Sequence, residues 1–214
     1  VAATNRRTDR AGVSGILEPV KSRFAAIVEL APNLDDWCNW ALDGNLPAEL
    51  VAFIRFRPDL LCKFDPTADM TQSPLPRTWA HAASLLGLAL PSDVEAAALA
   101  GCVGEGAAVE LLAFMSMWKQ LPSIDGILVD PDKATIPAEP AILYAVVTAL
   151  GQRTTDKNFD RVARFAARLA DDGHGEFGAL LIRDIMRKDP SLANTTTYVR
   201  IASGPLGQLI GGAA

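Results

Sequence analysis

Three polar residues of this sequence have side chains suited to phosphate chemistry. Asn5 follows a short apolar run, Arg23 precedes Phe24, and Arg77 follows Pro76. A guanidinium group pairs with phosphate through two parallel hydrogen bonds, and an asparagine amide both donates and accepts hydrogen bonds. Each residue also has an ordinary structural explanation, because Asn favours turns and Arg is mostly exposed on protein surfaces. Taken singly, none of the three establishes a site.

The spacing of the cysteines and histidines favours a structural role over a catalytic one. Cys38, Cys62 and Cys102 lie far apart and form no CxxC pair. That pattern is typical of reduced thiols, not of a disulfide framework or a zinc site. His81 and His174 are equally separated, without flanking ligands. We therefore expect no metal site.

Two further patterns have a structural and a functional interpretation. The Gly-rich turn Gly101–Gly106 has no strand before it, so tight helix packing is favoured over phosphate binding. Arg161, Arg164 and Arg168 form a basic stripe beside an apolar helix face. A solvated face is the favoured explanation, and a groove for a partner is the alternative.

Composition limits the protein class. The chain has 214 residues, of which 50% are hydrophobic and 21% charged, as in ordinary globular proteins and unlike disordered or fibrous chains. Its net charge of −5 disfavours nucleic acid and anionic membrane surfaces as partners. The most apolar stretch, Ala107–Trp118, contains Glu110 and Ser116 and is too short to span a membrane.

The first residues hold a basic cluster but no apolar segment typical of a secretory signal. We expect a cytoplasmic protein. Because the first residue is Val1 within an apolar run, we also expect a fragment of a longer polypeptide.

The apolar pattern changes once along the chain. Val1–Thr4 and Ala25–Leu30 are short apolar runs that suit buried strands. Asn33 is predicted to cap a helix, and from this residue onward the apolar residues recur at helical spacing. The predicted fold class is therefore mainly α, a helical bundle preceded by a short two-strand remnant of an α/β core.

The helical part divides into predicted units. Trp37 and Trp40 are interpreted as core anchors, and Ala107–Gln120, apolar nearly all round, as the central helix. The predicted organisation is a core remnant at 1–32, a helical unit at 33–120, a helical extension at 121–190 and a Thr- and Gly-rich tail at 191–214.

Order and spacing in the first ninety residues resemble the second half of a MoxR-like AAA+ ATPase module, found in bacterial and phage-related proteins. The matching features are a strand ending in Asn (VAATN), a segment ending in SRF, a second strand, and a helix opening with PRTW. The resemblance implies that Asn5 is sensor 1, Arg23 the arginine finger and Arg77 sensor 2 of a helical lid over 33–120. It is specific over about Val1–Gly87 and weakens towards Trp118.

In such a site, fixed cations stabilise the charge that develops on the γ-phosphate, and a polar group holds the attacking water. By the resemblance, Asn5 would orient the water, Arg23 would reach the nucleotide of a neighbouring subunit, and Arg77 would reach the nucleotide of its own. The family also implies a ring, commonly a hexamer, that remodels a client protein.

The sequence departs from the family in its phosphate-binding elements. A P-loop requires GxxxxGK[ST], and no Gly-Lys pair occurs in this chain. No apolar strand ending in Asp-Glu is present to hold magnesium. ATP and Mg²⁺ are therefore expected only in a full-length parent, and this chain alone is expected to be inactive. The alternative hypothesis is a free-standing helical module that binds a peptide or helix in a groove.

Overall fold

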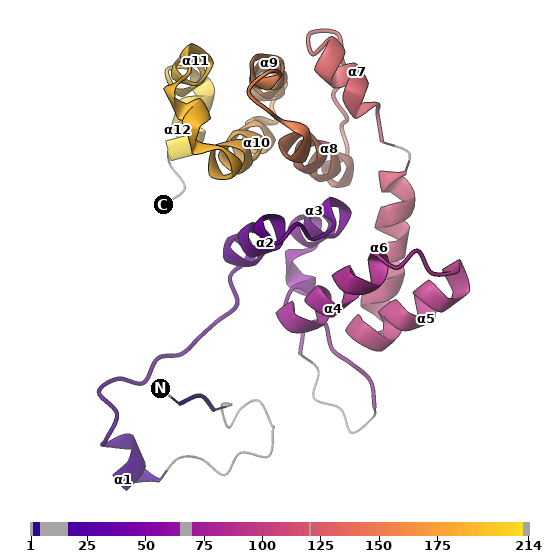
Figure 1. Cartoon of the computed structure of the whole chain (residues 1–214), viewed down its shortest axis with the longest axis vertical. Coiled ribbons are helices and arrows are strands. Elements are labelled where there is room, and N and C mark those ends of the chain that lie inside the picture. The colour runs from indigo at the N-terminus through magenta and orange to yellow at the C-terminus, as the bar shows by residue number, and fades with distance from the viewer. Residues whose placement is uncertain (1, 5–16, 65–69, 120, 212–214) are drawn as a thin grey trace.

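The computed structural model describes residues 2–4, 17–64, 70–119 and 121–211. These residues form helices joined by short connections, and no strand occurs among them (Figure 1). The prediction of a mainly α protein is therefore confirmed. The helices, with the two short 3₁₀ segments η2 and η3, are α1 (Glu18–Lys21), α2 (Leu34–Asp43), α3 (Ala48–Phe56), η2 (Pro58–Leu60), α4 (Pro76–Leu86), α5 (Ser92–Val103), α6 (Glu105–Trp118), α7 (Ile124–Val129), α8 (Pro140–Arg153), α9 (Phe159–Asp171), α10 (Gly175–Lys188), η3 (Pro190–Asn194), α11 (Thr196–Ala202) and α12 (Pro205–Gly211).

The predicted two-strand remnant is not formed. Residues 25–30 are extended and exposed, with Val28 at 84% and Leu30 at 91% exposure, and the described residues 2–4 are also outside any strand. A strand needs a neighbouring strand to pair its backbone N–H and C=O groups. Because the described residues contain no such neighbour, the apolar run alone does not produce a strand.

Helix starts follow local sequence signals. The Asn33 side chain accepts a hydrogen bond from the backbone N–H of Asp36 at 3.0 Å, which caps α2 as predicted. At α4 the Thr78 hydroxyl accepts a hydrogen bond from the backbone N–H of Leu75 at 2.9 Å, and Pro76 occupies the first turn, where its missing N–H costs nothing.

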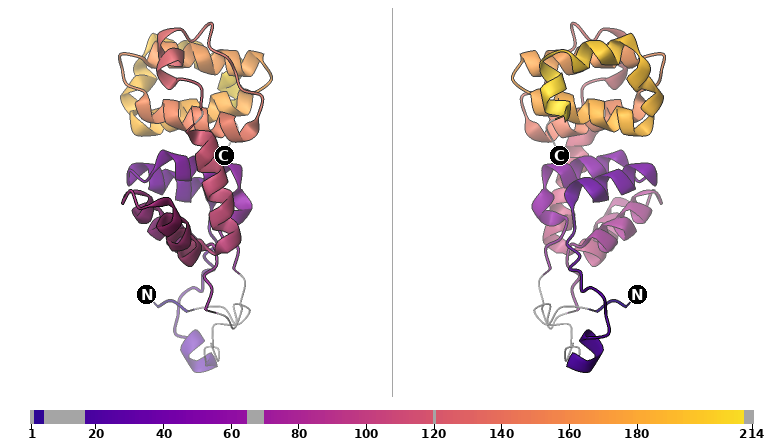
Figure 2. Two further views of the ribbon diagram at one scale, coloured as in Figure 1. Left: turned by 90° about the vertical axis from the view of Figure 1, so that its right-hand side faces the viewer. Right: turned by 90° about the vertical axis from the view of Figure 1, so that its left-hand side faces the viewer.

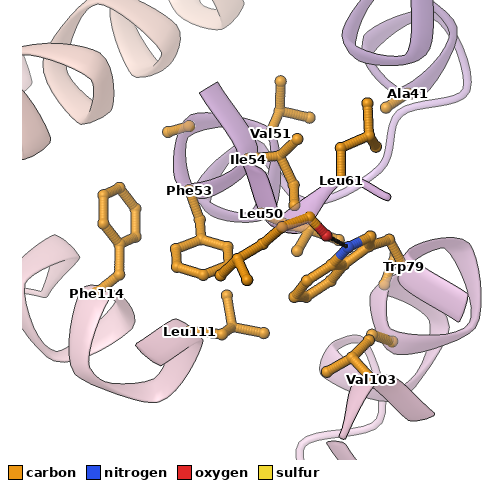
Figure 3. Close-up of a cluster of buried hydrophobic side chains, with 14 of the residues drawn as sticks. Ala41, Leu50, Val51, Phe53, Ile54, Leu61, Trp79, Val103, Leu111 and Phe114 are labelled. Atoms are coloured by element: carbon orange, nitrogen blue, oxygen red, sulfur yellow. Dashed lines mark hydrogen bonds between the residues drawn. The ribbon is translucent and has the colours of Figure 1, made fainter. Parts of the chain in front are cut away.

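A first hydrophobic cluster joins α2 to α6. Its centre contains Phe53, Trp79 and Phe114, whose rings lie in tilted or edge contacts (Figure 3). Trp79 is fully buried and donates its indole N–H to the carbonyl oxygen of Leu60 at 2.7 Å. This bond satisfies the one polar atom of the side chain, so the tryptophan can anchor the cluster.

The central helix of this cluster is α3, not α6 as predicted. Every residue from Leu50 to Arg55 is buried, whereas Val109 is 61% and Met117 36% exposed on α6. Helix α3 packs against both α6 and α8, and Figure 1 shows it directly beneath α8 and beside α6 (the same arrangement is seen from the sides in Figure 2). The apolar composition of α6 therefore did not identify the central helix, which the packing of α3 against α6 and α8 decided.

A second hydrophobic cluster joins α7 to α12. Helix α10 packs against both α8 and α9, α11 packs on α9, and α12 packs on α10 and α9. The segment expected to be a tail instead contains η3, α11 and α12 in its described part, and it buries Leu192, Ile201 and Leu206. Its threonines assist this, since the Thr195 side chain accepts from the backbone N–H of Tyr198 at 3.2 Å and caps α11.

Candidate functional site

Arg77 lies at the start of α4, which hydrogen bonds from two tryptophan side chains hold in place. The Trp37 indole donates to the Pro76 carbonyl oxygen at 3.1 Å, and the buried Trp79 binds the carbonyl of Leu60. Arg77 itself is exposed and forms no ion pair with another described residue. No acidic residue lies in the first turn of α4 to offset its charge against the positive end of the helix dipole. The backbone of this position is thus held firmly while its guanidinium stays open to solvent.

Arg23 lies on a different part of the molecule. It follows α1, its backbone N–H donates to the Val20 carbonyl oxygen at 3.2 Å, and its side chain is exposed. Helix α1 stands apart from α4 in all the views of Figures 1 and 2. The structure therefore does not bring Arg23 and Arg77 together. Asn5, the third predicted residue, lies outside the described residues.

A hollow of about 300 Å³ lies between residues 71–74 and the start of α6. Glu105 and Glu110 are at its edge together with Lys63. Glu110 pairs with Arg57, and Arg57 also donates to Asp59 at 3.1 and 3.0 Å and so lowers the pKa of that carboxyl. Two carboxylates beside one exposed lysine do not favour binding of an anion.

The Gly-rich turn explains how residues 71–74 come close to the start of α6. Gly104 has φ +83°, and a Cβ there would lie 2.8 Å from the Gln72 carbonyl oxygen. Tight packing is therefore found at Gly104, but against a loop residue and not against a helix as expected. It is not found at Gly101 or Gly106, where a Cβ would meet no atom within 4 Å.

The predicted basic stripe has a role that neither sequence interpretation included. Arg161 donates to the Leu128 carbonyl oxygen at 3.2 Å, and Arg164 pairs with Asp132. Arg168 donates to the carbonyl oxygens of Pro131 and Ala134. The stripe binds the segment that follows α7 within the same chain. Arg161 and Arg164 are exposed, so the solvated-face interpretation holds for them, although their contacts with the α7 region were not predicted. The partner groove stays the alternative.

An apolar groove of about 260 Å³ lies between α9, α11 and α12. Its floor contains Ala163, Ala167 and Ala170 at helical spacing, and Arg164 and Arg200 lie at its edge. Arg200 is already paired with Asp160 at 2.8 Å, as is common for exposed charges. The volume is below the usual range for small-molecule sites, about 300–1,000 Å³, and suits one apolar side chain of a partner.

Two other predicted features can be placed. Trp37 is buried as predicted, but Trp40 is 53% exposed, with its ring centroid 6.2 Å from that of Trp37, so it is not a core anchor. Cys38 is fully buried, and this burial raises the pKa of its thiol to about 11. Cys38 is therefore a neutral, unreactive packing residue near pH 7.

Among the described residues, no three His, Cys, Asp or Glu side chains are grouped so that they could hold a metal ion. In the same part of the chain, no helix has the length and apolar character needed to cross a membrane.

Comparison with known proteins adds no family assignment. No protein-family model, curated protein or solved structure matches the chain. The case for function therefore depends on the residues and geometry described above.

Proposed function

We propose that this chain is the C-terminal part of a MoxR-like AAA+ ATPase subunit: the last segment of the nucleotide-binding core, the helical lid and a helical extension. The whole subunit would couple ATP binding and hydrolysis to remodelling of a protein partner. One observation carries the proposal, which is the exposed apolar segment Ala25–Leu30 directly before the helical unit.

This segment is suited to a sheet that the described residues do not contain. Ile27 and Val28 point to opposite faces of an extended chain, and they are 71% and 84% exposed. A strand that is apolar on both faces is typical of a parallel sheet covered by helices on both sides. The AAA+ core has such a sheet, and in this proposal the rest of the parent subunit supplies it.

The position of Arg77 supports the same proposal. Its helix start is fixed by Trp37 and Trp79, and its guanidinium has no described anionic partner. A bound phosphate would offset the repulsion between this cation and the helix dipole and would accept two guanidinium hydrogen bonds. Arg77 would thereby make the position of the lid depend on the phosphate state of the nucleotide.

Arg23 would act on the neighbouring subunit. Its exposed position beside α1, apart from α4, agrees with a finger that points away from its own lid. Asn5 would orient the attacking water. Because the sequence contains neither a P-loop nor an apolar run ending in Asp-Glu, the parent would supply the residues that bind ATP and Mg²⁺, and ring neighbours would complete each site.

The test begins with the coding sequence upstream of Val1, which should encode GxxxxGK[ST] and an apolar strand ending in Asp-Glu. In the purified longer polypeptide, Arg23→Ala should reduce ATP hydrolysis about 10³-fold and leave nucleotide binding nearly unchanged. Lys21→Ala, two residues away on the same exposed segment, is the matched control and should hydrolyse ATP normally. An upstream sequence without a P-loop, or full activity of Arg23→Ala in an assembled ring, would contradict the proposal.

Arg77→Ala should behave differently, because it would serve the nucleotide of its own subunit. We expect weaker nucleotide affinity as well as slower hydrolysis, with partial recovery in Arg77→Lys, which keeps the charge but loses the planar fork. Normal affinity and rate in Arg77→Ala would show that this arginine is an ordinary surface residue.

The alternative, a helical module that binds a peptide or helix, is favoured by the groove between α9, α11 and α12. Its occupant would insert one apolar side chain over Ala167. Ala167→Trp would fill the groove and abolish such binding, whereas Ala113→Trp, on the exposed face of α6, is the matched control.

A further inference from the structure

A buried ion pair connects the two hydrophobic clusters. Arg55, in the last turn of α3, donates to both carboxylate oxygens of Asp184 on α10, at 2.7 and 2.8 Å. The two side chains are only 4% and 9% exposed. Arg55 also donates to the Thr148 hydroxyl of α8 at 3.3 Å. One guanidinium thus joins α3 of the first cluster to α8 and α10 of the second.

A second ion pair of opposite polarity lies on the same two bodies. Arg187, three residues after Asp184 on α10, pairs with Asp43 of α2 and donates to the Asn39 carbonyl oxygen at 3.2 Å. Helix α10 therefore presents an anion to α3 and a cation to α2. A shift of α10 along its axis by about one turn would place either Arg187 opposite Arg55 or Asp184 opposite Asp43, so only one register satisfies both pairs.

Helix α8 makes this contact close. Its Ala141 and Ala145 belong to the first cluster, whereas Leu143 and Val147 belong to the second. Small side chains allow the backbones of α3 and α8 to approach, and the larger ones fill the space against α9 and α10. The boundary between the two clusters is a packed interface and not a flexible linker.

An ion pair is an unexpected choice for such an interface if stability alone is considered. Replacement of a buried pair by apolar residues is often neutral or stabilising, because both charges lose their hydration on burial. What apolar residues do not supply is a unique orientation. The geometry therefore suits a device that fixes the angle between the clusters.

We propose that the Arg55–Asp184 and Arg187–Asp43 pairs make α2–α6 and α7–α12 move as one rigid body, so that a displacement of α4 is transmitted to the outer face of α9, α11 and α12. The rigid coupling is a property of this chain alone. Its use, transmission of lid movement from Arg77 to a partner on the extension, rests on the proposed ATPase function.

Distance measurements between two spin labels test the coupling without nucleotide. In a Cys62→Ser/Cys102→Ser background, labels at Ser84→Cys on α4 and Ser203→Cys after α11 report the angle between the bodies, since both positions are exposed. Cys38 is buried and stays unlabelled. The unmodified interface should give one narrow distance distribution, and a broad or divided distribution would overturn the proposal.

Two variants sharpen the test. Arg55→Met combined with Asp184→Leu should widen the distribution about twofold while leaving each cluster folded, because apolar contacts permit several orientations. Labels at Ser84→Cys and Ser116→Cys, both within the first body, are the matched control and should keep a narrow distribution. Arg187→Gln removes only the more exposed pair. If the double variant does not fold, the width of the distance distribution in Arg187→Gln tests the proposal instead.

A distribution as narrow in these folded variants as in the unmodified chain would overturn the proposal. Because no nucleotide or ring is present, that result would leave the proposed ATPase function untouched. Conversely, the absence of an upstream P-loop would remove the proposed use of the coupling and not the coupling itself.

Discussion

The Trp37 indole N–H donates to the Pro76 carbonyl oxygen at 3.1 Å, so α2 directly holds the residue that precedes Arg77. This bond joins positions 39 residues apart and satisfies the only polar atom of a buried tryptophan side chain. With the Trp79 bond to Leu60, it fixes the start of α4 on two sides. The backbone position of Arg77 therefore depends on residues of the core as well as on the loop bonds of Thr78.

Trp37→Phe should lower the free energy of unfolding by about 1 kcal/mol or somewhat more, because the Pro76 carbonyl loses its donor. Chemical denaturation monitored by circular dichroism measures this loss. Trp40→Phe is the matched control and should change stability by less than about 0.5 kcal/mol, since Trp40 is 53% exposed. An equal decrease in the free energy of unfolding in the two variants would show that the Trp37–Pro76 hydrogen bond does not contribute to stability.

Gly104→Ala should destabilise the chain by more than about 1 kcal/mol, because φ is +83° there and the new Cβ would lie against Gln72. Gly101→Ala should instead stabilise it by about 0.5–1 kcal/mol, because Gly101 lies within α5 and open space surrounds its Cβ position. The midpoint temperatures of thermal unfolding of the two variants should therefore shift in opposite directions. A shift in the same direction would contradict the assigned turn.

Alkaline pH should weaken the fold through Cys38. Burial raises the pKa of this thiol from its ordinary value of 9.0 to about 11, so the folded state retains the proton over a range in which the unfolded state loses it. The stabilising contribution is complete below pH 9.0 and disappears as pH rises towards 11, a change of about 3 kcal/mol.

Denaturation between pH 8 and 11 should therefore show a steeper loss of stability in the native sequence than in Cys38→Ala, which has no thiol to ionise. Other groups that titrate in this range affect both proteins equally. Identical pH profiles would mean that the thiol is not isolated from solvent.

Arg168→Ala should loosen the segment after α7, because the carbonyl oxygens of Pro131 and Ala134 lose a charged donor. We expect a cost of about 1–3 kcal/mol and faster amide hydrogen exchange over residues 130–136. Arg153→Ala removes an exposed ion pair with Asp125 and should change neither quantity much. Unchanged exchange in Arg168→Ala would show that other contacts hold this segment.

The sequence by itself determined where α2 and α4 begin, because the signals at these two helix starts are local. Asn33 caps α2 and Pro76 opens α4 as their residue types predict, since both effects act within one turn. The same local patterns predicted the helical class of the chain. They also led to the strand prediction at 25–30, which failed because pairing requires a second segment.

The tertiary structure alone decided which of several similar residues became central. Trp37 and Trp40 have the same residue type on one helix, yet only Trp37 finds an acceptor across 39 residues. Arg55 and Asp184 lie 129 residues apart on helices that carry other charged residues as well, so sequence analysis gives no signal that would pair them. Spacing along a chain fixes neighbours within a helix turn, whereas the partner of a buried charge depends on how whole helices pack.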